Sequence, residues 1–279
     1  MLNPCLGFTS MLIFWYLKSL DPFYGTGGLW LNLKRKKVKK MEKVKEKKVV
    51  ENPRLSLSQF AKYCAATDNS KRSIILKAKF TGGYIPKFYD RARASVREIL
   101  SANMNDNDLC FEILQRKALE LKAEAKEFPV KKDDYKNREY SAEGLLALKR
   151  SSRVLEPILD KFILNIPPPK SLNNTNTITI EDVKISSKVD LLLFEDAGLT
   201  EVGFISFNFT KRKLKRQEAE FWLYVLWYYH KLKGNVYNLS KCFLVDVYAG
   251  KIYTAIDERF MEQTTRKLCL EIASNWKIA

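Results

Sequence analysis

The sequence predicts a mixed α/β domain with a helical first part and a strand-rich second part. Between residues 56 and 165, apolar residues recur three and four positions apart, which is typical of amphipathic helices. After residue 177 apolar and polar residues alternate, which is typical of strands with one buried face. Prolines 167–169 and a polar stretch separate the two parts. We therefore expect a single domain over residues 56–279.

Four helices are expected in the first part of the domain. One begins after Ser56, whose hydroxyl can cap a helix, and places Leu57, Phe60 and Cys64 at helical spacing. A bend or restart is expected near Pro157, because proline interrupts the backbone hydrogen bonding of a helix. The other expected elements are helices at 92–100, 109–128 and 141–158, with a charged loop at 131–138.

The second part is expected to follow the order β-β-β-α-β-α. Tight turns at 186–187 and 196–198 would join the first three strands. A further strand pair would turn at Ala249-Gly250. The predicted elements are strands at 177–185, 188–194 and 201–209, a helix at 213–232, a strand pair at 241–254 and a helix at 257–275.

The N-terminal forty residues differ in composition from the rest of the chain. The apolar run at 7–17 is shorter than the roughly 20 residues needed to span a bilayer. The basic cluster at 34–40 follows this run, whereas a secretion signal carries its positive charge before it. We expect translation to begin at Met41, with residues 1–40 from a wrongly assigned start and 41–55 as a linker. The alternative is an arm that holds a peripheral membrane or scaffold protein on an anionic membrane.

The charge of the chain favours a polyanionic partner. Lysine and arginine number 49 against 32 aspartates and glutamates, which gives a formal net charge of +17. Such an excess favours DNA, RNA or an anionic membrane face. We expect nucleic acid, and DNA rather than RNA, as the partner. The alternative is a solvated basic surface without a dedicated ligand.

Cysteine and histidine usage restricts the chemistry. The five cysteines show no C-x-x-C spacing, which argues against structural zinc and iron–sulfur sites and favours a cytoplasmic protein. The single histidine, His230, lies in an aromatic run and is expected to be a half-buried helix residue. The chain has no glycine-rich phosphate loop. An ATP-driven motor, such as a helicase, would therefore be a separate partner.

Three segments carry a resemblance to a known family. Residues 55–64 contain a Ser-x-Ser-x-hydrophobic helix start, Val189-Asp190 lies in the second core strand, and Glu220-Phe-Trp-Leu-Tyr224 lies on the following helix. Together they resemble the PD-(D/E)XK nuclease superfamily, and more closely its RecB-like branch with its Gln-x-x-x-Tyr motif. The match covers roughly residues 56–255. It implies a restriction-endonuclease-like core, with a central mixed sheet flanked by helices and an N-terminal helical portion.

The resemblance also implies a metal site, of which one part is degenerate. In that family the strand aspartate and a second acid hold Mg²⁺, and a lysine shortly after that acid helps to activate the attacking water. Asp190 takes the first role, but Ser206 and Asn208 stand at the acid and lysine positions. A neutral hydroxyl is a poor Mg²⁺ ligand, and an amide supplies no positive charge. Glu201 lies too early in its strand to substitute and is expected to face solvent.

Compensation by neighbouring residues is the alternative. Asp190 and Glu220 would then hold Mg²⁺, and Lys211 or Lys213 would replace the missing lysine. Asp190 could equally be an ordinary strand-end carboxylate. Glu220 and Tyr224 lie four apart on a helix and could be a plain surface pair.

Basic residues gather around the helix that follows the third strand. We expect them to line a groove for a nucleic-acid backbone, whereas the aromatic residues of that helix are typical of a core. The expected function is nucleic-acid binding in DNA processing by a catalytically degenerate nuclease-like protein. The alternative is an active Mg²⁺-dependent nuclease. The residues expected to contact nucleic acid are Lys188, Lys211, Arg212, Lys213, Arg216 and Tyr224.

Overall fold

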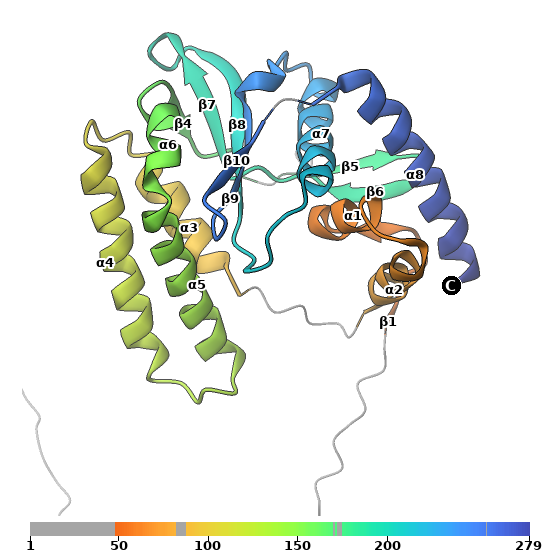
Figure 1. The fold of residues 1–279 in the computed structure, drawn as a ribbon, viewed down its shortest axis with the longest axis horizontal. Coiled ribbons are helices and arrows are strands. Elements are labelled where there is room, and N and C mark those ends of the chain that lie inside the picture. Colours follow the sequence, from red (N-terminus) through yellow and green to blue (C-terminus); the bar gives the residue numbers. More distant parts are fainter. Residues whose placement is uncertain (1–47, 82–87, 170, 172–174, 255) are drawn as a thin grey trace, which may run out of the picture. The chain divides into compact units, whose positions relative to one another are not determined.

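The computed structural model describes residues 48–81, 88–169, 171, 175–254 and 256–279 (Figure 1). The chain divides into two compact units, residues 1–44 and 45–279, and every described residue belongs to the second unit. The predicted start at Met41 and the basic cluster at 34–40 lie outside the described residues. Within them, no helix combines the length and the apolar character needed to cross a membrane.

A mixed five-stranded sheet forms the centre of the second unit and confirms the mixed α/β class. Its middle strand β8 pairs in parallel with β9 and antiparallel with β7, and both edge strands are antiparallel to their neighbours. Ile205 of β8 lies opposite Leu191 of β7 and Phe243 of β9. In spatial order the strands are β10 (Lys251–Tyr253), β9 (Cys242–Asp246), β8 (Thr200–Asn208), β7 (Leu191–Glu195) and β4 (Ile163–Asn165).

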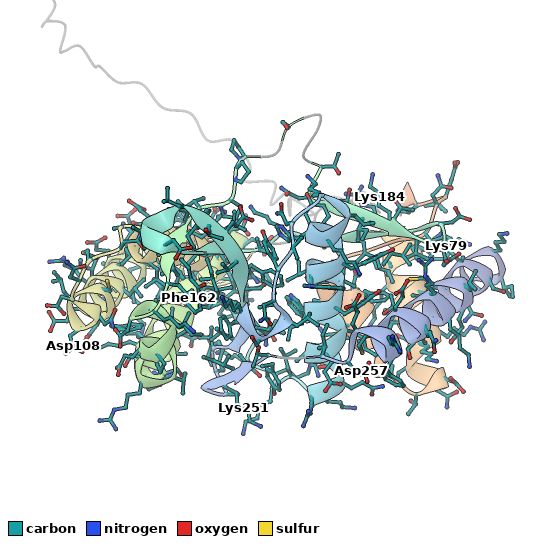
Figure 2. The ribbon with its side chains drawn as sticks, turned by 90° about the horizontal axis from the view of Figure 1, so that it is seen from above. Lys79, Asp108, Phe162, Lys184, Lys251 and Asp257 are labelled. Carbon is teal, nitrogen blue, oxygen red and sulfur yellow. The ribbon has the colours of Figure 1, made fainter. Side chains whose placement is uncertain are left out.

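The central sheet separates two hydrophobic cores. Side chains alternate between the faces of a strand, so Phe204 belongs to one core and Ile205 to the other. Figure 2 shows the two helical groups on opposite sides, with Asp108 of α4 at one side and Lys79 of α2 at the other. The Phe204 core contains residues of α1 (Leu57–Cys64), α2 (Asp68–Lys79), α7 (Arg216–Leu232) and α8 (Glu258–Ile278). The Ile205 core contains residues of α3 (Asp90–Leu100), α4 (Asn107–Ala125), α5 (Asp133–Arg150) and α6 (Ser152–Leu159).

Two smaller sheets accompany the Phe204 core. In the three-stranded sheet, β6 pairs in parallel with β2 and antiparallel with β5. In the other, β1 pairs with β3. The remaining elements are β1 (Lys48–Val49), β2 (Arg54–Leu55), β3 (Phe80–Thr81), β5 (Thr177–Ile180), β6 (Val183–Ser186) and the 3₁₀ turns η1 (Asp196–Gly198) and η2 (Leu239–Lys241).

The predicted order β-β-β-α-β-α needs correction at its first strand. Residues 177–185 form a hairpin, β5 and β6, that belongs to the three-stranded sheet rather than to the central one. The chain reverses at Glu181 and Asp182, whose φ angles are both positive (45° and 62°). Two-residue hairpin turns of this kind favour Asn-Gly or Asp-Gly, so Glu-Asp gives little sequence signal.

The helical part also departs from the sequence prediction. The helices expected at 92–100 and 109–128 are confirmed as α3 and α4. The predicted charged loop at 131–138 is wrong, because α5 already begins at Asp133. The break before α6 falls at Ser151, whereas Pro157 lies inside α6. Acidic side chains at Asp133 and Asp134 favour a helix start there, since they oppose the positive end of the helix dipole.

Ser56 caps α1 as expected, and its replacement gives a first testable prediction. The Ser56 hydroxyl accepts a hydrogen bond from the Gln59 amide (3.2 Å), and the Gln59 side chain accepts one from the Ser56 amide (2.9 Å). Ser56→Ala is expected to lower the free energy of unfolding by about 1 kcal/mol in urea titrations. Ser58→Ala, inside the same helix, is the matched control and should change it little. Equal effects of the two substitutions would contradict the capping role.

Candidate functional site

Asp190 lies just before β7 and is part of a buried ion pair. Its side chain accepts hydrogen bonds at Oδ2 from Arg93 Nη1 (2.5 Å) and from the backbone amide of Phe207 (2.8 Å). Arg93 Nη2 also donates to the Phe207 carbonyl (2.6 Å). Asp190 is only 3% exposed. The pair therefore joins α3 to the central strand β8.

This ion pair is unfavourable for a metal at Asp190. A hard divalent cation requires free carboxylate oxygens and is repelled by a fixed positive charge nearby. Arg93 bonds the same oxygen that also receives the Phe207 amide. Mg²⁺ bound through that oxygen would have to displace the guanidinium. The geometry fits a structural carboxylate better than a metal ligand.

Ser206 and Asn208, at the degenerate motif positions, are both buried in β8. Asn208 Nδ2 donates to Asp246 Oδ1 (3.2 Å), and its Oδ1 accepts from the Thr210 hydroxyl (2.8 Å) and amide (3.2 Å). Asp246 Oδ2 in turn accepts from the Leu214 amide (2.8 Å). Asn208 and Asp246 thus hold both ends of the segment between β8 and α7. Sequence reasoning missed Asp246, which ends an apolar strand and looks like an ordinary turn residue.

The segment held in this way carries a run of exposed cations, which we call the basic loop (residues 211–216). Lys211 pairs with Glu143 of α5 (2.8 Å), Arg212 with Glu218 (2.8 Å) and Arg216 with Glu220 (2.9 Å). The side chains of these three cations are 55%, 45% and 85% exposed. Lys213 is exposed and pairs with no acid among the described residues. The predicted cluster of basic residues therefore exists as a surface feature.

Glu220 is paired within its own helix and not with the residues around Asp190. Its carboxylate pairs with Arg216 one helical turn away. Across the described ranges, no three His, Cys, Asp or Glu side chains gather in a group that could hold a metal ion. Lys211, the proposed catalytic lysine, pairs instead with Glu143. The two acids and the lysine thus have separate partners.

Tyr224 and Lys188 do not line a groove together with the basic loop. Tyr224 is 1% exposed and stacks on Tyr228 in the Phe204 core, with ring centroids 5.6 Å apart. The expectation that its ring contacts nucleic acid disagrees with this burial. Lys188 is exposed and lines a pocket with Arg97 of α3. Trp222 and Trp227 are buried, as expected for the aromatic residues of α7.

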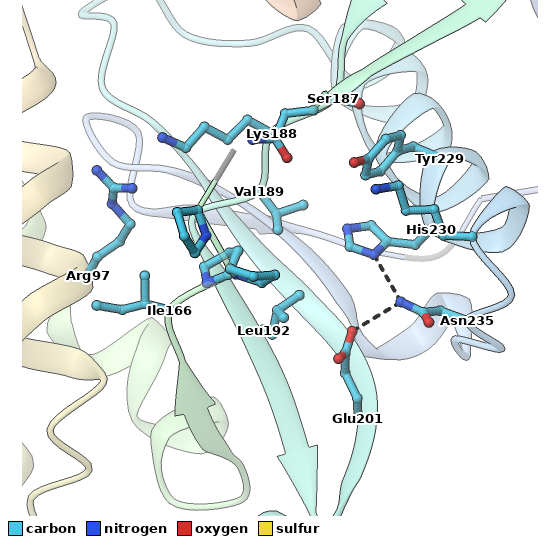
Figure 3. A pocket seen from close by; sticks show the side chains of 15 residues that line it. Arg97, Ile166, Ser187, Lys188, Val189, Leu192, Glu201, Tyr229, His230 and Asn235 are labelled. Carbon is cyan, nitrogen blue, oxygen red and sulfur yellow. Dashed lines mark hydrogen bonds between the residues drawn. The ribbon is translucent and has the colours of Figure 1, made fainter. Parts of the chain in front are cut away.

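The pocket is a cavity of about 480 Å³ that opens between the proline segment after β4, the start of β7 and the C-terminal end of α7 (Figure 3). Its apolar wall includes Ile166, Val189 and Leu192. Arg97 and Lys188 lie on one side of it, and His230 lies across from them. The pocket was not predicted from the sequence, although Lys188 was expected to bind a ligand, because its residues come from six separate segments.

A hydrogen-bonded network surrounds His230 at the pocket. Tyr237 donates its hydroxyl proton to Glu201, and the same hydroxyl lies 3.0 Å from His230 Nδ1. Asn235 Nδ2 donates to Glu201 Oε1 (3.2 Å) and lies 3.3 Å from His230 Nδ1. Burial raises the pKa of Glu201 and lowers the pKa of His230 to about 4, so the imidazole is neutral at pH 7. The expectation that Glu201 faces solvent is wrong, because it is half-buried in this network.

Comparison with known proteins gives no match: no family model, no curated protein and no solved structure is significantly similar to the chain.

Proposed function

We propose that the protein binds nucleic acid through the basic loop and does not cleave it with a metal ion. The observation that carries the proposal is the run of exposed cations on a segment that Asn208 and Asp246 hold at both ends. Cations fixed in this way can neutralise successive phosphates and release their counterions. Because the loop is held in place, binding requires little further ordering of its backbone.

The ion pairs of the basic loop do not prevent such binding. Exposed pairs of this kind contribute roughly 0–1 kcal/mol, so a phosphate can replace the carboxylate at small cost. Arg216 is 85% exposed despite its contact with Glu220. Lys213 has no acid to displace within the described residues. The loop therefore offers several cations to a phosphate backbone.

The proposal that catalysis is lost rests on the surroundings of the motif residues. Arg93 neutralises Asp190, and Ser206 and Asn208 supply neither the acid nor the lysine of the family. Glu220 and Lys211 pair with Arg216 and Glu143. An active nuclease that uses Asp190, Glu220 and Mg²⁺ would require these contacts to rearrange.

Removal of the basic loop's cations is expected to weaken nucleic-acid binding. The triple substitution of Arg212, Lys213 and Arg216 by alanine should lower affinity at least about tenfold and reduce the salt dependence of binding. Fluorescence anisotropy of labelled single- and double-stranded DNA and RNA, from 50 to 200 mM salt, measures both effects. Substitution of three exposed cations elsewhere, Arg116, Lys126 and Lys131, is the matched control with the same change in net charge.

Three outcomes of the same assays would count against the proposal. Equal losses in the two triple variants would show that only net charge matters. Mg²⁺- or Mn²⁺-dependent cleavage that EDTA and Asp190→Asn abolish would support the nuclease alternative. Binding of the full chain to anionic vesicles, without binding to any nucleic acid, would support a peripheral membrane protein.

A further inference from the structure

Two cations at the pocket lack an acidic partner. Arg97 uses Nε to donate to the Arg93 carbonyl (3.1 Å), and its terminal nitrogens have no acceptor among the described residues. Lys188 makes no side-chain ion pair within the same ranges. Its pKa is lowered, first by burial and then by the charge of Arg97, while Asp190 and Asp90 act in the opposite direction. Figure 3 shows the two side chains on the same side of the cavity. An anion bound between them would relieve their mutual repulsion.

The opposite side of the pocket presents two buried polar atoms. His230 Nδ1 already lies within hydrogen-bond distance of the Tyr237 hydroxyl (3.0 Å) and Asn235 Nδ2 (3.3 Å). Nε2 is the other ring nitrogen of His230. It has no partner among the described residues, although His230 is only 7% exposed. The hydroxyl of Ser187, which also lines the cavity, is buried and equally without a partner. Buried polar atoms without partners are costly, and these two, beside one cavity, can bond to a ligand that enters it.

The space between these two sides suits a flat, weakly polar group. Ile166, Val189 and Leu192 supply aliphatic surface, and Pro167 and Pro169 add their rings. The volume of about 480 Å³ lies within the roughly 300–1,000 Å³ of small-molecule sites. The pocket therefore combines cations, an apolar wall and a buried imidazole nitrogen without a partner among the described residues, which lies across from the cations.

We propose that this pocket binds a nucleoside monophosphate unit. The phosphate would lie between Arg97 and Lys188, since a guanidinium and an ammonium together match several phosphate oxygens. The base would lie along the aliphatic wall and form a hydrogen bond with His230 Nε2. The same unit can be a free nucleotide or the 5′-phosphorylated end of a strand. The proposal does not depend on the basic loop, because none of residues 211–216 lines the cavity.

Calorimetry with the full chain tests the proposal with three probes: the whole nucleotide, its sugar-phosphate part and its nucleoside part. Adenosine 5′-monophosphate is expected to bind at least tenfold more tightly than ribose 5-phosphate or adenosine. Arg97→Ala and Lys188→Ala should each weaken adenosine 5′-monophosphate at least tenfold and leave adenosine unchanged. His230→Phe, which keeps a ring against Phe204, should weaken adenosine 5′-monophosphate and leave ribose 5-phosphate unchanged. Lys213→Ala in the basic loop is the control and should have no effect.

Three results of these titrations would overturn the proposal or a part of it. No binding of adenosine 5′-monophosphate at millimolar concentration to the folded chain would overturn the proposal. Unchanged binding in both Arg97→Ala and Lys188→Ala would also overturn it, and these variants test it even if His230→Phe does not fold. Ribose 5-phosphate binding as tightly as the nucleotide would overturn the role assigned to the base.

Oligonucleotides identify the source of the unit and separate this proposal from nucleic-acid binding by the basic loop. Competition by a 5′-phosphorylated oligonucleotide, but not by its 5′-hydroxyl counterpart, would support the pocket as a site for strand ends. Competition by free nucleotides alone would support it as a nucleotide site. In the triple variant of the basic loop, loss of oligonucleotide binding with intact nucleotide binding supports both proposals. Nucleotide binding without any oligonucleotide binding by the unmodified chain would overturn only the proposed function.

Discussion

Arg93→Ala is expected to lower the free energy of unfolding by about 3 kcal/mol, because it leaves the buried carboxylate of Asp190 without its counter-charge. Asp190 is nearly inaccessible to water while Arg93 covers it, and water that enters the vacated space would supply no positive charge. The substitution also removes the bond from Arg93 to the Phe207 carbonyl and the contact of the guanidinium with the Phe209 ring. Urea denaturation followed by circular dichroism measures the change.

Two control variants separate the ion pair from other effects of the substitution. Arg91→Ala removes an exposed arginine from the same helix, where its contact with Glu124 spans 3.5 Å, and should cost about 0–1 kcal/mol. Asp190→Asn keeps an acceptor for the Phe207 amide and should cost less than Arg93→Ala, because Arg93 is 29% exposed and can be hydrated. A loss below about 1 kcal/mol in Arg93→Ala would contradict the structural role of the pair.

Gly203→Ala is expected to destabilise the protein by about 3 kcal/mol through a backbone clash. A Cβ at this position would lie 2.0 Å from the carbonyl oxygen of Lys241 and 2.8 Å from its carbonyl carbon. Neither atom can move away without separating β8 from the segment that leads into β9. Thermal and urea denaturation of the variant measure the effect.

Gly234 provides the matched control for this glycine substitution. No atom lies within 4 Å of a Cβ built there, so an added methyl group would meet no clash. Its φ of +88° still disfavours alanine, at a cost of about 1 kcal/mol. Equal losses in Gly203→Ala and Gly234→Ala would argue against the close approach of β8 to Lys241.

The sequence predicts elements well where the apolar pattern is long and regular. The helices α3, α4, α7 and α8 and the strands β7 to β10 all follow from apolar spacing. The hairpin of β5 and β6 does not, because its reversal at Glu181-Asp182 lacks the usual turn residues. The short strand β2 is equally hard to predict, since its pairing with β6 is set by tertiary contacts.

The sequence predicts the charged residues of the candidate site but not the residues with which they pair. The cations of residues 211–216 are visible in the sequence, and they form an exposed loop. Asp190 and Arg93 are 97 positions apart in the sequence, so no local pattern predicts their pairing. The network of His230, Tyr237 and Glu201 is likewise formed by residues from one helix, one loop and one strand. Such contacts depend on the fold as a whole and not on sequence spacing.

The position of β8 between the two cores has a consequence for cooperativity. Phe204 and Ile205 are adjacent in the chain, fully buried, and packed against different groups of helices. Opening of either helical group would expose one face of this strand to water, and β8 also bonds to both β7 and β9. We therefore expect the two helical groups on either side of the central sheet to unfold as a single thermodynamic unit, coupled through β8.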